Sequence, residues 1–507
     1  MSFPRASGIL LHPTSLPGRF GIGELGKEAY QFADFLASTG QRLWQVLPLG
    51  PVGYGNSPYQ CLSVFAGNPL LISLEKLVED KCLEPADLDN APSFPEDKVD
   101  YDSVIEFKTP LLEKSFETFR KKAVPGEQEQ FEVFCQRNAS WLETYSLFMA
   151  LKEAHDFAIW NTWEEDIRKR QPKSLERWSK KLAREIYCHK YQQYQFFKQW
   201  SEIKKYCNER GIRIIGDMPI FIALNSAEVW SHPEMFYLDD RGRPTVVAGV
   251  PPDYFSRTGQ LWGNPLYRWD VMARDGYAWW IERFRATRDL VDIIRLDHFR
   301  GFEKYWEIPG TDTTAVNGRW VPGPGAELFQ AVQNALGTLD IIAEDLGMIT
   351  PEVEALREQL GFPSMRVLQF NFDSDPKADA YRPHNYPRNC VVYTGTHDNN
   401  TTIGWFRGED VKDSTQSREE REKETQLALK YMGTDGREIN WDFIRLALMS
   451  VADTAIIPMQ DVLGLDSEAR MNLPGTMEGN WRWRFVSDML TKEIKARLKE
   501  LTALYGR

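Results

Sequence analysis

The sequence predicts an α/β fold, and within that class a (β/α)8 TIM barrel, on three observations. First, eight short apolar runs rich in β-branched residues recur along the chain, as is typical of strands buried on both faces. Second, segments with the apolar spacing of amphipathic helices separate many of these runs, which favours a parallel sheet covered by helices. Third, no G-x-G-x-x-G follows the first run, and this disfavours the main competitor, a doubly wound open sheet.

The expected strands are distributed over almost the whole chain. Their ranges are residues 8–12, 43–47, 212–217, 291–297, 340–344, 365–370, 390–394 and 453–457. About 165 residues separate the second range from the third, far more than one connecting helix requires. We therefore expect a single barrel over residues 1–507 with two insertions, a helical subdomain over approximately 75–180 and a loop-rich subdomain over approximately 220–290, after the third strand.

Helical patterns and loop composition account for much of the remaining chain. The helical patterns cover residues 24–39, 141–155, 191–210, 276–290 and 350–360. Three of these segments are followed directly by Gly40, Gly211 and Gly361, and glycine commonly ends a helix because it adopts positive φ without steric strain. By contrast, residues 247–269 combine glycine, proline and aromatic residues, a composition that suits a loop lying over a site.

The composition excludes several classes of protein. The 507 residues carry a formal charge of −12, from 61 basic and 73 acidic residues, and 42% are hydrophobic, so the chain is globular rather than disordered. The acidic balance argues against a nucleic acid or an anionic membrane surface as partner. Six widely spaced cysteines form no C-x-x-C pair, which predicts reduced thiols. No apolar run is long enough to span a membrane and proline soon interrupts the N-terminal segment, so we expect a soluble, cytoplasmic protein.

Carboxylates lie at the ends of four of the predicted strands. They are Asp217, Asp297, Glu344 and the carboxylate of the His397–Asp398 pair. In a (β/α)8 barrel the carboxyl ends of the strands meet at one mouth, where reactive groups gather. Each of these residues taken singly has a structural explanation, such as a helix cap or a core histidine. Four carboxylates at one mouth repel one another, so their gathering is costly unless they serve a cation, a metal or proton transfer. Glycosidic bond cleavage needs one carboxyl group as an acid and another as a nucleophile or charge-stabilising group.

The position of Arg295 separates the expected roles of two of these carboxylates. Arg295 precedes Asp297 by two residues, so both side chains lie on the same face of one strand and point into the barrel. A neighbouring guanidinium keeps a carboxylate ionised, as a nucleophile requires. Glu344 would instead need a raised pKa to donate a proton to a leaving oxygen.

Short motifs around these residues resemble those of a known family. The sequences RLDHF, AEDLG, TGTHDN and GDMPIFI, at residues 295–299, 343–347, 394–399 and 216–222, are similar to the successive motifs of the α-amylase clan. Three further motifs, GNSPYQ, PPDYFS and GQLWGNP at residues 55–60, 251–256 and 259–265, narrow the resemblance. It is to the amylomaltases or disproportionating enzymes, the 4-α-glucanotransferases of glycoside hydrolase family 77, and it runs from near Leu10 to near Asn472.

The resemblance implies a retaining double displacement on α-1,4-glucan. Asp297 would be the nucleophile, Glu344 the general acid and then the base, and Asp398 the residue that stabilises the transition state. Tyr59 would stack on the reacting sugar ring, and Arg295 would orient the nucleophile. The full set implied to bind substrate is Tyr59, Ser57, Asp217, Asp253, Gln260, Trp262, Asn264, Arg295, His298, Asp373, His397 and Asn472.

The resemblance also implies the partners of the chain. Malto-oligosaccharides and α-1,4-glucans would serve as donor and acceptor and glucose as acceptor, with neither nucleic acid nor membrane involved. It implies no organic cofactor and no obligatory metal, and the sequence contains no H-E-x-x-H, P-loop or EF-hand spacing.

Three other functions compete with transfer. An α-amylase-type hydrolase shares the same carboxylates, because water rather than sugar then attacks the same intermediate. The aromatic, proline-rich segment at residues 249–265 favours transfer, since transfer needs acceptor contacts and exclusion of water. A non-catalytic glucan-binding protein would not need the complete set of three carboxylates, and a nucleotide-sugar transferase would need a phosphate-binding glycine loop.

Overall fold

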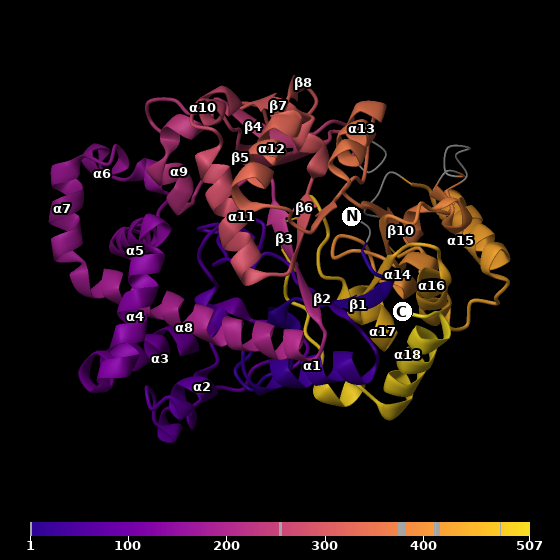
Figure 1. Ribbon diagram of the computed structural model, residues 1–507, viewed down its shortest axis with the longest axis horizontal. Helices are drawn as coiled ribbons and strands as arrows, with labels where there is room; N and C mark the ends of the chain where they lie inside the picture. The colour runs from indigo at the N-terminus through magenta and orange to yellow at the C-terminus, as the bar shows by residue number, and fades with distance from the viewer. Residues whose placement is uncertain are drawn as a thin grey trace.

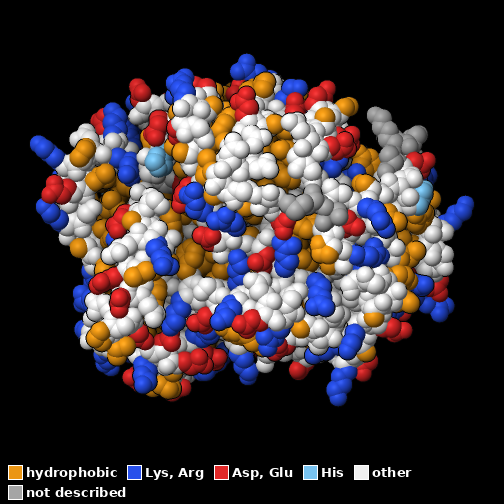
Figure 2. Space-filling view, viewed as in Figure 1, with side chains coloured by type: hydrophobic (Ala, Val, Ile, Leu, Met, Phe, Trp, Pro, Cys, Tyr) orange, Lys and Arg blue, Asp and Glu red, His pale blue; other side chains and the backbone are white. Residues whose placement is uncertain are grey.

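The computed structural model describes residues 3–252, 256–373, 379, 381–409, 411, 416–476 and 478–507 (Figure 1). Among these residues, no helix is both long enough and apolar enough to cross a membrane. All six cysteines are free thiols, as their spacing predicts. Acidic and basic side chains are interspersed over the face seen in Figure 2, rather than gathered by sign.

Eight parallel strands form the central sheet, and each corresponds to one of the eight predicted runs. They are β1 (Ala6–Leu10), β2 (Leu43–Gln45), β3 (Arg213–Pro219), β6 (Ile293–Asp297), β9 (Ile341–Ala343), β10 (Ser364–Val367), β11 (Cys390–Tyr393) and β12 (Thr454–Pro458). Their order in the sheet is β10-β11-β12-β1-β2-β3-β6-β9. The backbone N–H of Ala343 in β9 donates to the carbonyl of Pro363, just before β10, at 3.1 Å. This contact brings the two ends of the sheet together, and the (β/α)8 barrel is confirmed.

Helices surround the barrel and extend far to one side of it (Figure 1). Those between β2 and β3 are α2 (Leu74–Glu79), α3 (Tyr101–Lys122), α4 (Pro125–Arg137), α5 (Ala139–Ala154), α6 (Glu165–Arg168), α7 (Pro172–Lys181) and α8 (Ala183–Glu209). The others are α1 (Lys27–Ser38), α9 (Ala227–Ser231), α10 (Trp269–Arg274), α11 (Ala278–Leu290), α12 (Gly325–Leu336), α13 (Pro351–Leu360), α14 (Thr402–Arg407), α15 (Arg418–Met432), α16 (Ile439–Met449), α17 (Met459–Leu463) and α18 (Lys492–Leu504). The five predicted helical segments all lie on helices.

A second, antiparallel sheet lies beside the barrel. The sequence did not predict these strands. Its strands are β4 (Val246–Val250), β5 (Gln260–Pro265), β7 (Lys304–Pro309) and β8 (Arg319–Pro322), in the order β5-β4-β7-β8. The segment expected to be loop-rich supplies only β4 and β5. The second partner of β4, β7, comes from beyond β6, so this ladder joins parts of the chain that no local pattern connects.

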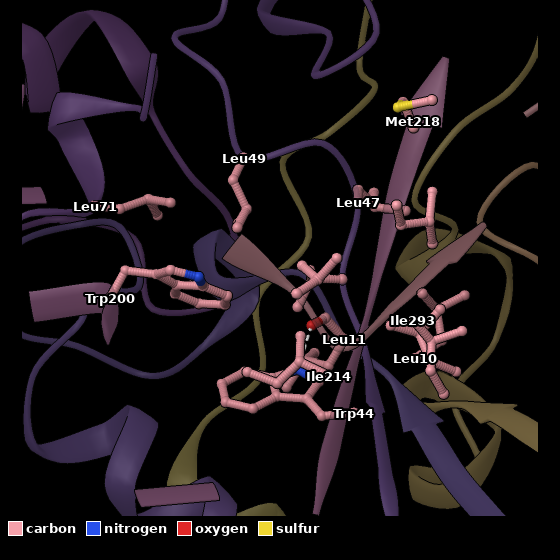
Figure 3. Packing of buried hydrophobic residues seen from close by; sticks show 14 of the residues in the cluster. Leu10, Leu11, Trp44, Leu47, Leu49, Leu71, Trp200, Ile214, Met218 and Ile293 are labelled. Carbon is pink, nitrogen blue, oxygen red and sulfur yellow. Dashed lines mark hydrogen bonds between the residues drawn. The ribbon is translucent and has the colours of Figure 1, made fainter. Parts of the chain in front are cut away.

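The core fills the space between the strands and the covering helices (Figure 3). Trp44 of β2 is fully buried and its indole N–H donates to the carbonyl of Leu11 at 2.8 Å. Trp200 of α8 faces it from outside the barrel, with the ring centroids 6.4 Å apart. Trp141 and Tyr191, which lie in two of the predicted helical segments, are both buried in this core.

Candidate active site

The ends of β3 and β6 bring together a cluster around one arginine. The register of these strands places Asp217 directly opposite Arg295. The Arg295 Nη1 donates to Asp217 Oδ2 at 2.6 Å and to Asp297 Oδ1 at 3.1 Å. The Tyr59 hydroxyl donates to the same Oδ2 of Asp217 at 2.7 Å. These four predicted residues therefore form one connected network, with the arginine side chain only 4% exposed.

Glu344 follows β9, the next strand around the barrel. The β6–β9 ladder pairs Leu296 with Ala343, so Glu344 lies beside Asp297 at the mouth. Its Oε2 accepts from the backbone N–H of His298 at 2.6 Å and its Oε1 from that of Leu346 at 3.0 Å. His298 has φ of 50°, in the left-handed region, and this turn directs its N–H toward the glutamate.

Burial and mutual repulsion govern the charges of this cluster. Burial raises the pKa of Asp297, and the Asp217 and Glu344 carboxylates raise it further, against the opposing effect of Arg295. Burial also raises the pKa of Glu344, against Arg295 and the two backbone N–H donors. One guanidinium faces several carboxylates here, and the buried carboxylates favour one another's neutral forms. Among the described contacts, Arg295 hydrogen-bonds directly to Asp297 and not to Glu344.

Asp398 is held from the opposite side of the mouth by a loop near the C-terminus. Its Oδ1 accepts from the Asn472 side-chain amide at 2.6 Å, and the His397 Nε2 lies 3.3 Å from the same oxygen. Arg470 donates to the backbone carbonyls of Asp398 and Asn472, at 2.6 and 2.7 Å. The Asp398 side chain is 46% exposed, so it is oriented yet open to a ligand.

His397 and Tyr59 form a stacked pair at the floor of the site. Their rings are nearly parallel, with an interplanar angle of 14° and centroids 5.1 Å apart, and Trp481 packs against both. Burial lowers the pKa of His397, so the imidazole is neutral near pH 7. The stacked pair therefore presents a flat, uncharged surface beside the carboxylates.

Strand β5 carries a second group of predicted residues. The Trp262 ring packs edge-on against the ring of His298, with centroids 4.8 Å apart, and its indole N–H donates to Gln260 Oε1 at 3.1 Å. Asn264 is buried and accepts from the Gln60 side chain at 3.5 Å. These contacts connect β5 to both the Tyr59 loop and the turn after Asp297.

The three predicted residues that remain are Ser57, Asp373 and Asp253. The Ser57 hydroxyl accepts from the backbone N–H of Tyr59 at 3.2 Å, which gives it a part in shaping the Tyr59 loop. Asp373 lies partly buried beyond β10, after the short helix η8 (Leu368–Phe370). Asp253 lies outside the described residues.

Sequence reasoning missed Arg470 and Trp481, although both contribute to the site. Neither stands at a strand end, and their neighbourhood is set by a loop that returns to the mouth from far along the chain. The positive φ of Trp481, 64°, is a feature that only the structure shows. Among the described residues, no three His, Cys, Asp or Glu side chains are arranged to hold a metal ion.

Comparison with known proteins points to one family. The glycoside hydrolase family 77 model, described as 4-alpha-glucanotransferase, matches residues 11–489. The 4-alpha-glucanotransferases of Synechocystis sp. and Thermus thermophilus are each 52% identical to this chain, over 99% of it and over 98% and 99% of their own lengths. The amylomaltase of Streptococcus agalactiae, solved in complex with acarbose, superposes with a TM-score of 0.94 at 41% identity and 99% coverage of both chains.

These matches confirm the resemblance carried by the motifs. They extend over nearly the whole chain rather than over the barrel alone. Because the named relatives are transferases, the comparisons do not favour the alternative of an α-amylase-type hydrolase. The chain belongs to the 4-alpha-glucanotransferases of glycoside hydrolase family 77.

Proposed function

We propose that the cluster at the barrel mouth transfers segments of α-1,4-glucan by a retaining double displacement. In the first step an Asp297 oxygen attacks the anomeric carbon and forms a covalent bond to it. The bond between that carbon and the 4-oxygen of the leaving sugar breaks, and this oxygen takes the proton from Glu344. The products are a glucosyl-enzyme ester, a shorter glucan and an ionised Glu344.

The second step reverses the first with a new acceptor. The ionised Glu344 takes the proton of the acceptor 4-hydroxyl as that oxygen bonds to the anomeric carbon, and the bond to Asp297 breaks. Net configuration is retained. Malto-oligosaccharides, longer α-1,4-glucans and glucose all present such a hydroxyl, and we assign all three as acceptors.

The contacts of Arg295 are the observation that carries this assignment. They favour the anion of Asp297 against the burial that raises its pKa, whereas Glu344 is buried with no cation in hydrogen-bond contact among the described residues, which supports it as the proton donor. Asp297 and Glu344 thus have the opposite charge states that the first step needs. Asp217 Oδ1 is buried without a partner among the described side chains, so it is suited to accept from a sugar hydroxyl.

The surrounding side chains support the remaining substrate contacts. Tyr59 and His397 offer a flat face for the reacting ring, and Asp398 stabilises the positive charge that develops on it. Trp262 and Gln260 lie on the β5 side, where an acceptor that displaces water favours transfer over hydrolysis.

Incubation of the purified chain with maltotriose tests the proposal. We expect glucose together with longer malto-oligosaccharides, while the number of reducing ends stays constant, because each transfer makes one glycosidic bond for each one broken. Asp297→Asn should lower the rate by about 10⁴-fold or more with little change in melting temperature. Asp289→Asn, an exposed carboxylate of α11, is the matched control and should remain active.

Two outcomes would contradict the proposal. Formation of glucose and maltose alone, with one new reducing end per cleavage, would indicate a hydrolase. Near-wild-type activity of Asp297→Asn would remove the nucleophile assignment.

A further inference from the structure

Asp345, the residue after Glu344, occupies the seam where the barrel closes. The other neighbouring strands of the described barrel are joined by ladders of backbone pairs. Between β9 and β10, the backbone hydrogen bond from Ala343 to Pro363 is followed by a second hydrogen bond. Its acceptor is a side-chain oxygen instead of a backbone carbonyl. Here Asp345 Oδ1 accepts from the backbone N–H of Met365 at 2.7 Å. The Asp345 carboxylate therefore continues the hydrogen bonding between β9 and β10 toward the mouth of the barrel.

Two arginines surround the same carboxylate. Arg357 of α13 places its Nε 3.2 Å from Asp345 Oδ2, and Arg366 of β10 places its Nη1 3.9 Å from that oxygen. Arg357 also donates to the carbonyl of Phe362, which precedes β10. The Asp345 side chain is only 4% exposed, so these ion pairs are made away from bulk water.

Asp345 and Glu344 face opposite ways from one short segment. Glu344 is directed to the mouth, where His298 and Leu346 donate to it, while Asp345 is directed into the seam. The backbone of Glu344 is itself paired with β6, its N–H donating to Leu296 and its carbonyl accepting from Phe299, each at 3.0 Å. On the side that faces β10, the segment is held by the hydrogen bond from Ala343 to Pro363 and, nearer the mouth, by the one from Met365 to Asp345.

We propose that Asp345 is a positioning residue, which places the Glu344 carboxyl for proton transfer by holding β9 against β10 and α13. Asp345 does not touch the sugar. The proposal rests on the proposed role of Glu344 as acid and base. Proton transfer needs heavy atoms within hydrogen-bond reach, and a displacement of about 1 Å in such a group can lower the rate by about 10²-fold.

Two glycosyl donors with different leaving groups distinguish a misplaced acid from a general loss of activity. Cleavage of maltotriose requires a proton from Glu344. In α-maltosyl fluoride the carbon–fluorine bond breaks as Asp297 attacks, and fluoride departs as the anion, with no proton required from the enzyme. The measured quantities are glucose release from maltotriose and fluoride release from α-maltosyl fluoride, each in the first turnover.

Asp345→Ala removes both the hydrogen-bond acceptor and the charge from the seam. We expect it to slow glucose release by about 10²-fold and fluoride release by less than about fivefold. Asp345→Asn keeps an oxygen that accepts from Met365 but loses the charge, so its loss in glucose release should be smaller. Asp340→Asn is the matched control, because Asp340 precedes the same strand at the opposite end of the barrel and pairs with Arg213. It should leave both rates within about threefold.

Equal losses with the two donors in Asp345→Ala, or no loss with either, would overturn the proposal. If Asp345→Ala does not fold, as judged by its melting transition, the same comparison in Asp345→Asn decides. Glu344→Gln, assayed with both donors, tests the proposed function separately. In this variant, slow glucose release with near-normal fluoride release supports Glu344 as the acid, whatever the Asp345 variants show. Normal glucose release would remove the assignment of Glu344 as the acid, and the proposal that Asp345 positions it would fall as well.

Discussion

Among the described residues, Arg295 is the cation in hydrogen-bond contact with both Asp217 and Asp297, and these contacts favour the charged form of each carboxylate. Its two contacts stabilise negative charge on β3 and β6, at one side of the mouth. Glu344 receives only backbone N–H donors and lies in a buried position that favours the neutral form. In the proposed mechanism, the division between nucleophile and acid follows from which residue the guanidinium contacts.

The first prediction at this scale concerns pH. The transfer rate should fall as pH decreases and Asp297 becomes protonated, and this limb lies above the usual aspartate range because burial raises its pKa. The rate should fall again as pH increases and Glu344 loses its proton, above the usual glutamate range. His12 and His298 do not contribute, because burial lowers their pKa values to about 3.

Measurement of kcat/KM for maltotriose across pH checks this bell-shaped profile. For first-turnover fluoride release from α-maltosyl fluoride by Glu344→Gln, the basic limb should disappear while the acidic limb remains. A basic limb that persists in that variant would assign it to another group.

Part of this network follows from the sequence. The two-residue spacing predicts that Arg295 and Asp297 share a face, and strand ends predict Asp217 and Glu344. The link from Tyr59 to Asp217 joins residues 158 positions apart, and it depends on how the loop after β2 folds back. Arg470 was not predicted for the same reason, since its contacts are to backbone carbonyls that any residue presents.

At the scale of elements, α3 is attached to the barrel by a buried ion pair. Lys108 of α3 is completely buried and donates to Glu24 and, at 2.8 Å each, to the carbonyls of Leu70 and Ile72. Burial lowers the pKa of Lys108 and raises that of Glu24, so each charge depends on the other. A partner that remains alone in this position would be strongly disfavoured.

Lys108→Met should therefore destabilise the protein by about 3–5 kcal/mol, because it leaves Glu24 and two carbonyls buried without their donor. The double variant with Glu24→Gln should recover part of the loss, since it removes the uncompensated charge. The measurement is the midpoint of chemical unfolding. Lys76→Met is the control, because its partner Glu202 is exposed, and it should change stability by less than about 1 kcal/mol. A single variant as stable as the wild type would show that the ion pair contributes nothing.

The elements also show what local patterns can predict. The eight barrel strands were predicted because each is buried on both faces and reads as an apolar run. Strands β4 and β7 were not, because their pairing is decided by partners in other parts of the chain: Val247 pairs with Ile308, and neither neighbourhood alone indicates the other. The boundary of β10 was set too late for a similar reason, since residues 368–370 continue the apolar run as η8 rather than as strand.

For the whole molecule, we propose one barrel over residues 1–507 that carries a helical subdomain over approximately 75–180 and a second insertion over approximately 220–290. Helix α8 couples the first insertion to the barrel. At 27 residues it is about 40 Å long, and it packs against α1 on one side and against α3, α4 and α5 along its length. Phe116 contacts Tyr187, and Phe119 contacts Tyr191, at centroid distances of 5.8 and 4.9 Å.

We expect the insertion and the barrel to unfold together, because neither keeps its core without α8. Hydrogen exchange followed by mass spectrometry at increasing denaturant should show α3, α5 and β3 losing protection at the same concentration. Phe119→Ala should lower that concentration for all three. Loss of protection in α3 and α5 well before β3 would contradict the expectation.

The contacts of α8 have a consequence for any shortened form of the chain. In a barrel without an insertion, the outer surface of such a helix faces water and bears polar residues. Here aromatic residues of α8, among them Tyr187 and Tyr191, contact aromatic residues of α3, so a chain from which α3–α5 were deleted would expose an apolar face and tend to aggregate. A shortened chain without α3–α5 would therefore need polar substitutions on α8 before it could stay in solution.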